Sequence, residues 1–196
     1  MSFPATSLRA TILPRATAIS NAALVIGGVI FLGLLAQVAV PVPGSPVPVT
    51  GQTLGVLLVG TSYGATLGFA TFATYLLVAI AGAPIFAGQG FGIAHLTGAT
   101  GGYLIGMLIS TYVLGSLAHK RLDQKFITAL PSMLIGSVIT FTFGLLWLHQ
   151  FTGKSWDWTI SAGLTPFIIG EAIKIAIAGT SFPTLWRLVN RKNLQS

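Results

Sequence analysis

Cysteine is absent from this chain, and acidic side chains are nearly so: only Asp123, Asp157 and Glu171 occur among its 196 residues. The lack of cysteine excludes disulfide bonds and thiolate metal sites. Charged residues form 7% of the sequence, whereas soluble domains contain about 25%. No Asp, Glu, Lys or Arg lies between residues 16 and 119. With 53% hydrophobic residues and a mean hydropathy of +0.85, the chain is predicted to be a multi-pass protein of the cell membrane.

Sequence motifs for common catalytic reactions are also missing. The chain has no paired-carboxylate pattern, no Ser-His-Asp arrangement and no phosphate-binding loop of the form G-x-x-x-x-G-K-[ST]. Its histidines, His95, His119 and His149, do not have the spacing of metal ligands. We therefore predict a protein that is not an enzyme and carries no metal or cofactor. Because it cannot hydrolyse ATP alone, uphill transport would need a partner or an ion gradient.

Apolar runs divide the chain into a basic lead, about residues 1–16, and six predicted transmembrane helices in one domain, residues 1–196. A span needs roughly 20 residues, so the length suits about six spans. The second and third spans are short and fit a thin hairpin or a tilted, broken pair. The predicted ranges are Thr17–Val40, Gln52–Thr61, Gly64–Ile80, Gly98–Leu117, Ile127–His149 and Pro166–Leu188.

The basic residues indicate the orientation of this all-α protein. With six spans, both termini and the 119–126 loop share one side of the membrane, and the opposite side holds only Lys154. The positive-inside rule then places both termini in the cytoplasm. A distribution of this kind is typical of a topology signal and argues against a nucleic-acid-binding face. The residues on the basic side are Arg9, Arg15, Lys120, Arg121, Lys125, Arg187, Arg191 and Lys192.

Two irregular segments lie on the predicted outer side. Pro41–Thr50 has four prolines in eight residues, which excludes a helix, and its apolar character predicts a loop packed over other residues. Gly82–Thr97 is rich in glycine and uncharged. Non-helical backbone near membrane depth is tolerated where it is buried or lines a cavity. Beside it, glycines at 98, 102 and 106 predict close helix packing, with a ligand contact as the alternative.

Glu171 and Lys174 are the strongest candidate site residues. They lie three positions apart, on one face of the last predicted span. Charges inside a span are costly and usually face a cavity or a partner. The pair is either a structural ion pair or an acceptor and donor for a polar, anionic small molecule.

Other candidates are weaker alone, because each polar side chain can instead satisfy backbone groups. Polar residues near the outer side are Gln52, Thr53, Gln89, His95, Thr100 and Tyr103, and Phe86 and Phe91 could line an apolar ligand. In the first span, Ala18 with Ala22 and Ala23 with Gly27 form small-residue faces. These faces could dock a partner or pack within the fold.

Four segments in this order make the chain resemble the BioY family, the biotin-specific S components of energy-coupling-factor (ECF) transporters. They are P-V-P-G-S-P-V-P-V-T-G-Q-T-L-G-V-L-L-V-G (41–60), G-A-P-I-F-A-G-Q-G-F-G (82–92), G-A-T-G-G-Y-L-I-G (98–106) and P-F-I-I-G-E-A-I-K (166–174). Together they extend over most of the chain. Where the family often has Asp, this chain has the longer Glu171.

The resemblance implies a six-helix S-component fold with an outward-facing biotin site under the loop between the first two spans. It implies that Glu171 and Lys174 contact biotin, with contributions from Gln89 and Tyr103. It also implies a membrane coupling subunit that docks on the small residues of the first span, and two ATP-binding subunits. The alternatives are an S component for another small vitamin, and a structural membrane subunit in which the charged pair only clamps helices.

Overall fold

The computed structural model describes residues 7–13 and 17–193, without the side chains of Lys192 and Asn193. Arg15 and most of the basic lead lie outside these residues. The described part is almost wholly helical. Its elements are α1 (Leu8–Ile12), α2 (Ala18–Gln37), β1 (Ala39–Val40), β2 (Val49–Thr50), α3 (Gln52–Tyr63), α4 (Ala65–Ile80), η1 (Ala87–Gln89), α5 (Gly92–Leu96), α6 (Gly101–His119), α7 (Phe126–Thr152), α8 (Trp156–Gly163), η2 (Thr165–Phe167) and α9 (Ile168–Asn193).

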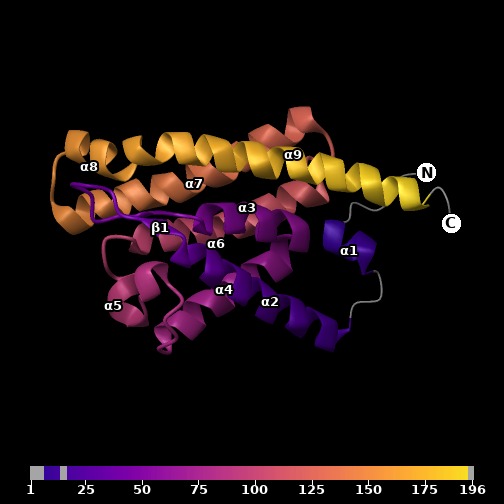
Figure 1. Cartoon of the computed structure of the whole chain (residues 1–196), viewed down its shortest axis with the longest axis horizontal. Helices are drawn as coiled ribbons and strands as arrows, with labels where there is room; N and C mark the ends of the chain where they lie inside the picture. Colours follow the sequence, from indigo (N-terminus) through magenta and orange to yellow (C-terminus); the bar gives the residue numbers. More distant parts are fainter. Residues whose placement is uncertain (1–6, 14–16, 194–196) are drawn as a thin grey trace.

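Helices α7 and α9 run along the long axis of the molecule, and α2 and α4 lie obliquely to them (Figure 1). Helix α6 packs against α3, α4 and α7. Helix α9 packs on α7 and α3, and α2 packs on α4 and α3. The β1–β2 ribbon, α5 and α8 lie at one end of this bundle, whereas α1 and the C-terminal part of α9 lie at the other (Figure 1). We call these the loop end and the basic end.

Glycine permits the close approach of α6 to its neighbours. A Cβ on Gly102 would lie 2.1 Å from the Cβ of Trp147, and one on Gly106 would lie 2.8 Å from the Cα of Thr140. Both neighbours belong to α7, so the glycine face of α6 is a packing face, as the simpler interpretation of the sequence predicted. This contact fixes α7 against the helix that carries Tyr103.

The predicted spans correspond to six of the observed helices, with ends that differ by a few residues. The last differs in its start: Pro166 lies in η2, and the regular helix α9 begins only at Ile168. The sequence interpretation did not identify α1, α5 or α8, which are each eight residues or shorter. Short helices lack the repeated periodicity on which such predictions depend.

Four helical segments of the described part are long and apolar enough to cross a membrane, namely Ala18–Gln37, Gly101–His119, Phe126–Thr152 and the stretch Trp156–Arg191. Helix α4 is apolar but has 16 residues, and α3 has 12. At 1.5 Å per residue these two helices measure about 24 Å and about 18 Å, which is shorter than a hydrocarbon core of about 30 Å. The six-span count and the cytoplasmic termini therefore stay predictions.

Candidate functional site

Glu171 and Lys174 meet at the start of α9. The Nζ of Lys174 lies 3.4 Å from Oε2 of Glu171, and the Glu171 side chain is nearly buried, with 6% of its surface exposed. Glu171 lies in the first turn of its helix. There the partial positive charge of the helix N-terminus favours a carboxylate.

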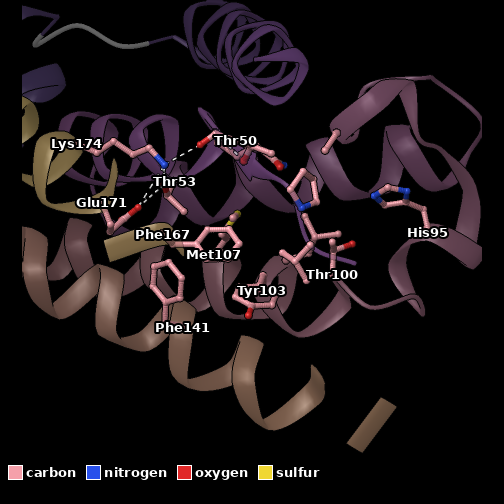
Figure 2. A pocket seen from close by; sticks show the side chains of 15 residues that line it. Thr50, Thr53, His95, Thr100, Tyr103, Met107, Phe141, Phe167, Glu171 and Lys174 are labelled. Carbon is pink, nitrogen blue, oxygen red and sulfur yellow. Dashed lines mark hydrogen bonds and ion pairs between the residues drawn. The ribbon is translucent and has the colours of Figure 1, made fainter. Parts of the chain in front are cut away.

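Hydroxyl groups from two other helices complete the environment of this pair, and Figure 2 shows the one from Thr53 between Glu171 and Lys174. Thr53 of α3 donates to Oε2 of Glu171 at 2.8 Å, and Ser137 of α7 donates to Oε1 at 2.7 Å. Lys174 donates to Oγ1 of Thr53 at 2.8 Å and to the carbonyl oxygen of Thr50 at 2.7 Å. The two charges thus tie α9 to α3, to α7 and to the base of the proline loop.

A cavity of about 40 Å³ lies beside the charged pair, within the loop-end half of the bundle. One water needs roughly 10–15 Å³ by this kind of measure, so the cavity has room for a few waters. Sites for small organic ligands usually have about 300–1,000 Å³. In this structure the pocket is therefore closed on its own side chains, and a bicyclic ligand would have to displace some of them.

The proline-rich loop covers the cavity. Val47 is 4% exposed, and Val47 and Pro48 line the cavity wall. The ends of the loop are held by the β1–β2 ribbon, in which Val40 pairs with Val49. The amide of Gly51 donates to carbonyl oxygens at the end of α2, at 3.0 and 3.1 Å. The loop is fixed at its base, and Val47 and Pro48 pack over the cavity, as the proline pattern predicted, whereas Pro41, Pro43 and Pro46 are exposed.

Aromatic rings form the opposite wall. Tyr103, Phe141 and Phe167 pack with ring centroids 5.7–6.4 Å apart, and all three line the cavity. The Tyr103 hydroxyl donates to the carbonyl of Gly163 at 2.8 Å, so its ring, and not its hydroxyl, is what the cavity presents. A Cβ on Gly144 would lie 2.3 Å from this ring. The glycine in α7 therefore makes room for the tyrosine.

A second hollow of about 320 Å³ lies outside the first, at the loop end. The two spaces share Pro48, Ala87, His95 and Thr100 as a common wall. His95 stacks on Phe86 with centroids 4.8 Å apart, and burial lowers the pKa of its imidazole, which keeps the ring neutral at physiological pH. Figure 2 shows His95 on the far side of the pocket from Lys174. The shared residues therefore separate the outer hollow from the cavity beside the charged pair.

Gln37, the last residue of α2, holds the segment that carries this wall. Its Nε2 donates to the carbonyl of Phe86 at 3.0 Å and approaches that of Ile85 at 3.4 Å, while its Oε1 accepts from the amide of Gln89 at 3.0 Å. The hydroxyl of Tyr75 also donates to Ile85, and it accepts from Gln52. Hydrogen bonds therefore connect the end of α2 with the pocket residue Gln52.

The structure places four of the six predicted ligand residues in the lining of the inner cavity: Gln52, Tyr103, Glu171 and Lys174. Phe86 is fully buried behind His95, and Gln89 is exposed with its side chain outside the lining. Ser137 was not predicted as a site residue, and a serine in an apolar helix gives little signal. Its role depends on the packing of α7 against α9, which the sequence alone does not indicate.

The small-residue faces of α2 are open. Ala18, Ala22, Ala23 and Gly27 are all exposed, and a Cβ added to Gly27 would meet no other described atom within 4 Å. The neighbouring Gly28 instead packs on Thr71 of α4. The sequence left two roles open for these four residues, docking of a partner or packing within the fold. The four residues do not pack against the rest of the described chain, so the second role is not seen.

Comparison with known proteins agrees with this arrangement. A model of the BioY family matches residues 7–191. The chain belongs to the BioY family. A relative from Lactococcus lactis subsp. cremoris (strain MG1363), named biotin transporter BioY2, is 37% identical over 169 residues, which cover 85% of this chain and 89% of that protein. A probable biotin transporter BioY from Pyrococcus horikoshii is 35% identical over 143 residues, covering 73% of this chain and 82% of that protein.

One solved structure has the same fold. It is a crystal structure of the S component for biotin from an ECF-type ABC transporter, with a TM-score of 0.79 and 23% identity, covering 88% of this chain and 94% of that one. The S-component fold that the resemblance implied is thereby confirmed. As a BioY family member with several long apolar helices, the chain is a multi-pass membrane protein.

Proposed function

We propose that this chain is the biotin-binding S component of an ECF transporter and takes up biotin together with a membrane coupling subunit and two ATP-binding subunits. In this proposal the six predicted spans place both termini in the cytoplasm and the loop end outside. The observation that carries the proposal is a buried acid and lysine beside a cavity, in a chain whose relatives are named biotin transporters.

The chemistry of the pair suits the ureido ring and the carboxylate of biotin. Glu171 can accept from the ureido N–H groups, and Lys174 can donate to the ureido oxygen or to the valerate carboxylate. The rings of Tyr103, Phe141 and Phe167 offer an apolar wall to the bicycle. A ligand that lacked the matching groups would leave buried polar atoms unpaired, which penalises analogues.

Binding requires the pocket to enlarge, because its present volume is about 40 Å³. The bond from Lys174 to the Thr50 carbonyl joins the charged pair to the proline loop. A ligand that takes a hydrogen bond from Lys174 competes with Thr50, so entry of the ligand and movement of the loop are coupled. Residues 41–48 then close over the bound molecule and exclude water.

The test measures biotin binding to the purified protein, as wild type and as Lys174→Ala, with Lys154→Ala as the control. Lys154 is an exposed lysine at the loop end. We expect Lys174→Ala to weaken binding at least about tenfold, since charge-assisted hydrogen bonds are strong, and Lys154→Ala to bind as wild type. Unchanged affinity in Lys174→Ala would refute the assigned site.

A competition panel of other small vitamins separates biotin from the alternative of a different ligand. Native mass spectrometry of the purified protein adds the mass of any molecule that copurifies. A ligand other than biotin would keep the S-component proposal and replace its substrate.

A purely structural role is the second candidate, and one observation favours it. Every polar atom of the pair already has a partner within the fold: Glu171 accepts at both oxygens, and Lys174 donates to Thr50, Thr53 and Glu171. A clamp of this kind would hold α3, α7 and α9 without any ligand.

A further inference from the structure

A separate cavity of about 320 Å³ lies at the basic end. Polar side chains from four different helices line it, among them Arg9 of α1, Asn21 of α2, Thr66 of α4 and His119 of α6. Ser7, which caps α1, lines it too. No part of this cavity touches the residues assigned to biotin.

Arg9 is held in place at this cavity. It lies on α1, which is anchored by the buried Leu8 and packs against α3. The Arg9 guanidinium donates to Oδ1 of Asn21. Its Nε is buried and has no hydrogen-bond partner among the described residues. A buried donor without a partner is costly, so a ligand that accepts from it would be favoured.

The chain offers no acid to neutralise this arginine. Its first acidic residue is Asp123, and it has only three. Asp123 accepts from the indole of Trp186 at 2.6 Å, Glu171 is bound in the pocket, and Asp157 lies in α8 at the loop end. Among the described residues that line the cavity there is no aspartate or glutamate. The counter-charge for Arg9 therefore comes from outside the side chains of this protein.

Gly64, which joins α3 to α4, packs closely on two of the polar lining residues. It has φ +83°, and a Cβ there would lie 3.0 Å from Cε1 of His119 and 3.3 Å from Ser7. The room for an anion is therefore not at this turn but in the cavity of about 320 Å³ that these side chains help to line. His119 is oriented by a 2.8 Å contact from Nδ1 to the carbonyl of Gly115. This contact uses Nδ1, so it leaves Nε2 of His119 available to a ligand.

We propose that this cavity binds a phosphate group, held by the Arg9 guanidinium together with the side chains of Ser7, Asn21 and His119. The guanidinium fork matches the geometry of phosphate oxygens. The group belongs either to the headgroup of an anionic phospholipid or to free phosphate. The lipid headgroup and free phosphate present the same phosphate oxygens to the arginine. Helix α1 lies at the basic end of the bundle, and basic residues near a membrane surface attract anionic lipid headgroups.

The test uses the full chain, purified in detergent, and native mass spectrometry with added phosphatidylglycerol or phosphatidylcholine. The variants are Arg9→Gln and, as the control, Arg191→Gln, which removes an exposed charge at the same end. We expect wild type and Arg191→Gln to retain phosphatidylglycerol, and Arg9→Gln to lose it at least about tenfold. Equal loss in both variants would overturn the proposal, whereas no loss in either would exclude a lipid headgroup as the source of the phosphate.

A second variant guards against simple misfolding. Asn21→Asp places a carboxylate beside Arg9 at almost unchanged shape, so the chain supplies its own counter-charge. We expect this variant to bind less phosphatidylglycerol while its melting temperature stays at or above that of wild type. If Arg9→Gln loses the lipid but Asn21→Asp binds it as wild type does, the assigned site is wrong.

The source of the phosphate follows from a third measurement, the melting temperature of delipidated protein with and without inorganic phosphate. If phosphate raises the melting temperature of wild type but not of Arg9→Gln, free phosphate is a ligand. If only phosphatidylglycerol does so, the ligand is a lipid headgroup. If neither ligand distinguishes wild type from Arg9→Gln, the proposed site is wrong.

Discussion

Two substitutions, Lys174→Met and Glu171→Gln, made singly and together, distinguish a ligand-binding role of the charged pair from a role as a helix clamp. Methionine keeps most of the length of lysine and removes its charge. In Lys174→Met, a carboxylate that is 6% exposed keeps its hydrogen bonds from Thr53 and Ser137 but loses its cation. Breaking a buried pair on one side only is strongly destabilising, because a buried charge is left uncompensated.

The expected loss follows from the geometry. At 3.4 Å and an effective dielectric constant of about 20, the Coulomb attraction is about 5 kcal/mol. The net loss of stability is smaller than this attraction, because the variant no longer has to desolvate the ammonium group of Lys174 on folding. We therefore expect Lys174→Met to lower the free energy of unfolding by about 3 kcal/mol. For a chain of this size, that lowers the melting temperature by roughly 6–12 °C.

The double variant Glu171→Gln/Lys174→Met removes both charges and should recover most of that stability, because replacing both members of a buried pair is often nearly neutral. Thermal unfolding in detergent, for wild type, both single variants and the double variant, gives the coupling energy. Additive effects of the two single variants, or a shift below about 2 °C in Lys174→Met, would refute this account.

Biotin binding to the folded double variant then decides between the two functions. A binding site loses affinity when its acceptor and donor are both removed, although the fold is intact. A variant that stays folded and keeps wild-type affinity would show that the pair is a clamp only.

Three further predictions concern residues outside the pair. Gln37→Ala should weaken biotin binding several-fold and speed amide exchange in residues 85–89, since each lost hydrogen bond costs about 1 kcal/mol; unchanged exchange would contradict the bracing role. Gly144→Ala should push the Tyr103 ring towards the cavity, lowering both affinity and stability by about 1–3 kcal/mol; wild-type values for both would count against it. Asp123→Asn should raise the melting temperature at pH 7 and have little effect on it near pH 4. A larger rise in melting temperature near pH 4 than at pH 7 would contradict a raised pKa of Asp123.

The sign for Asp123 follows from its surroundings in the loop between α6 and α7. Burial raises the pKa of its carboxyl, against the opposing effects of the Trp186 indole, its own backbone amide and His119. A carboxyl whose pKa is raised on folding contributes stability while it is protonated, and this contribution is lost as the pH rises through the pKa in the folded state. Asparagine removes the ionisation and can still accept from Trp186.

Hydropathy and the spacing of charges were sufficient to predict the six longer helices and the charged pair, because both are local properties of the sequence. The juxtaposition of Glu171 and Lys174 follows from their i, i+3 spacing on one helix. The cover formed by Val47 and Pro48 followed from prolines that exclude a helix and apolar residues that need burial. The short helices α1, α5 and α8 could not be predicted in this way.

Contacts between helices far apart in the sequence could not be predicted from local pattern. Ser137 and Thr53 reach Glu171 because α7 and α3 both pack on α9, and neither residue is unusual in its own segment. Gln89 is a further case. The resemblance implies a ligand contact for Gln89, which stays a prediction, while the structure shows a contact that no local pattern indicates, from its backbone amide to Gln37.

The same hydrogen bonds that close the pocket also suggest how its two ends are connected. Lys174 bonds to Thr50, Thr50 lies in the ribbon that follows α2, and Gln37 at the end of α2 holds the outer wall of the pocket. In the proposed function, a ligand that displaces Lys174 from Thr50 would act on the ribbon, and a partner seated on the exposed small residues of α2 would contact the helix that ends at Gln37. Glu171, the feature that is most costly in a membrane, is stable here because three helices supply its partners. A ligand can replace those partners only by moving the helices and the loop that carry them.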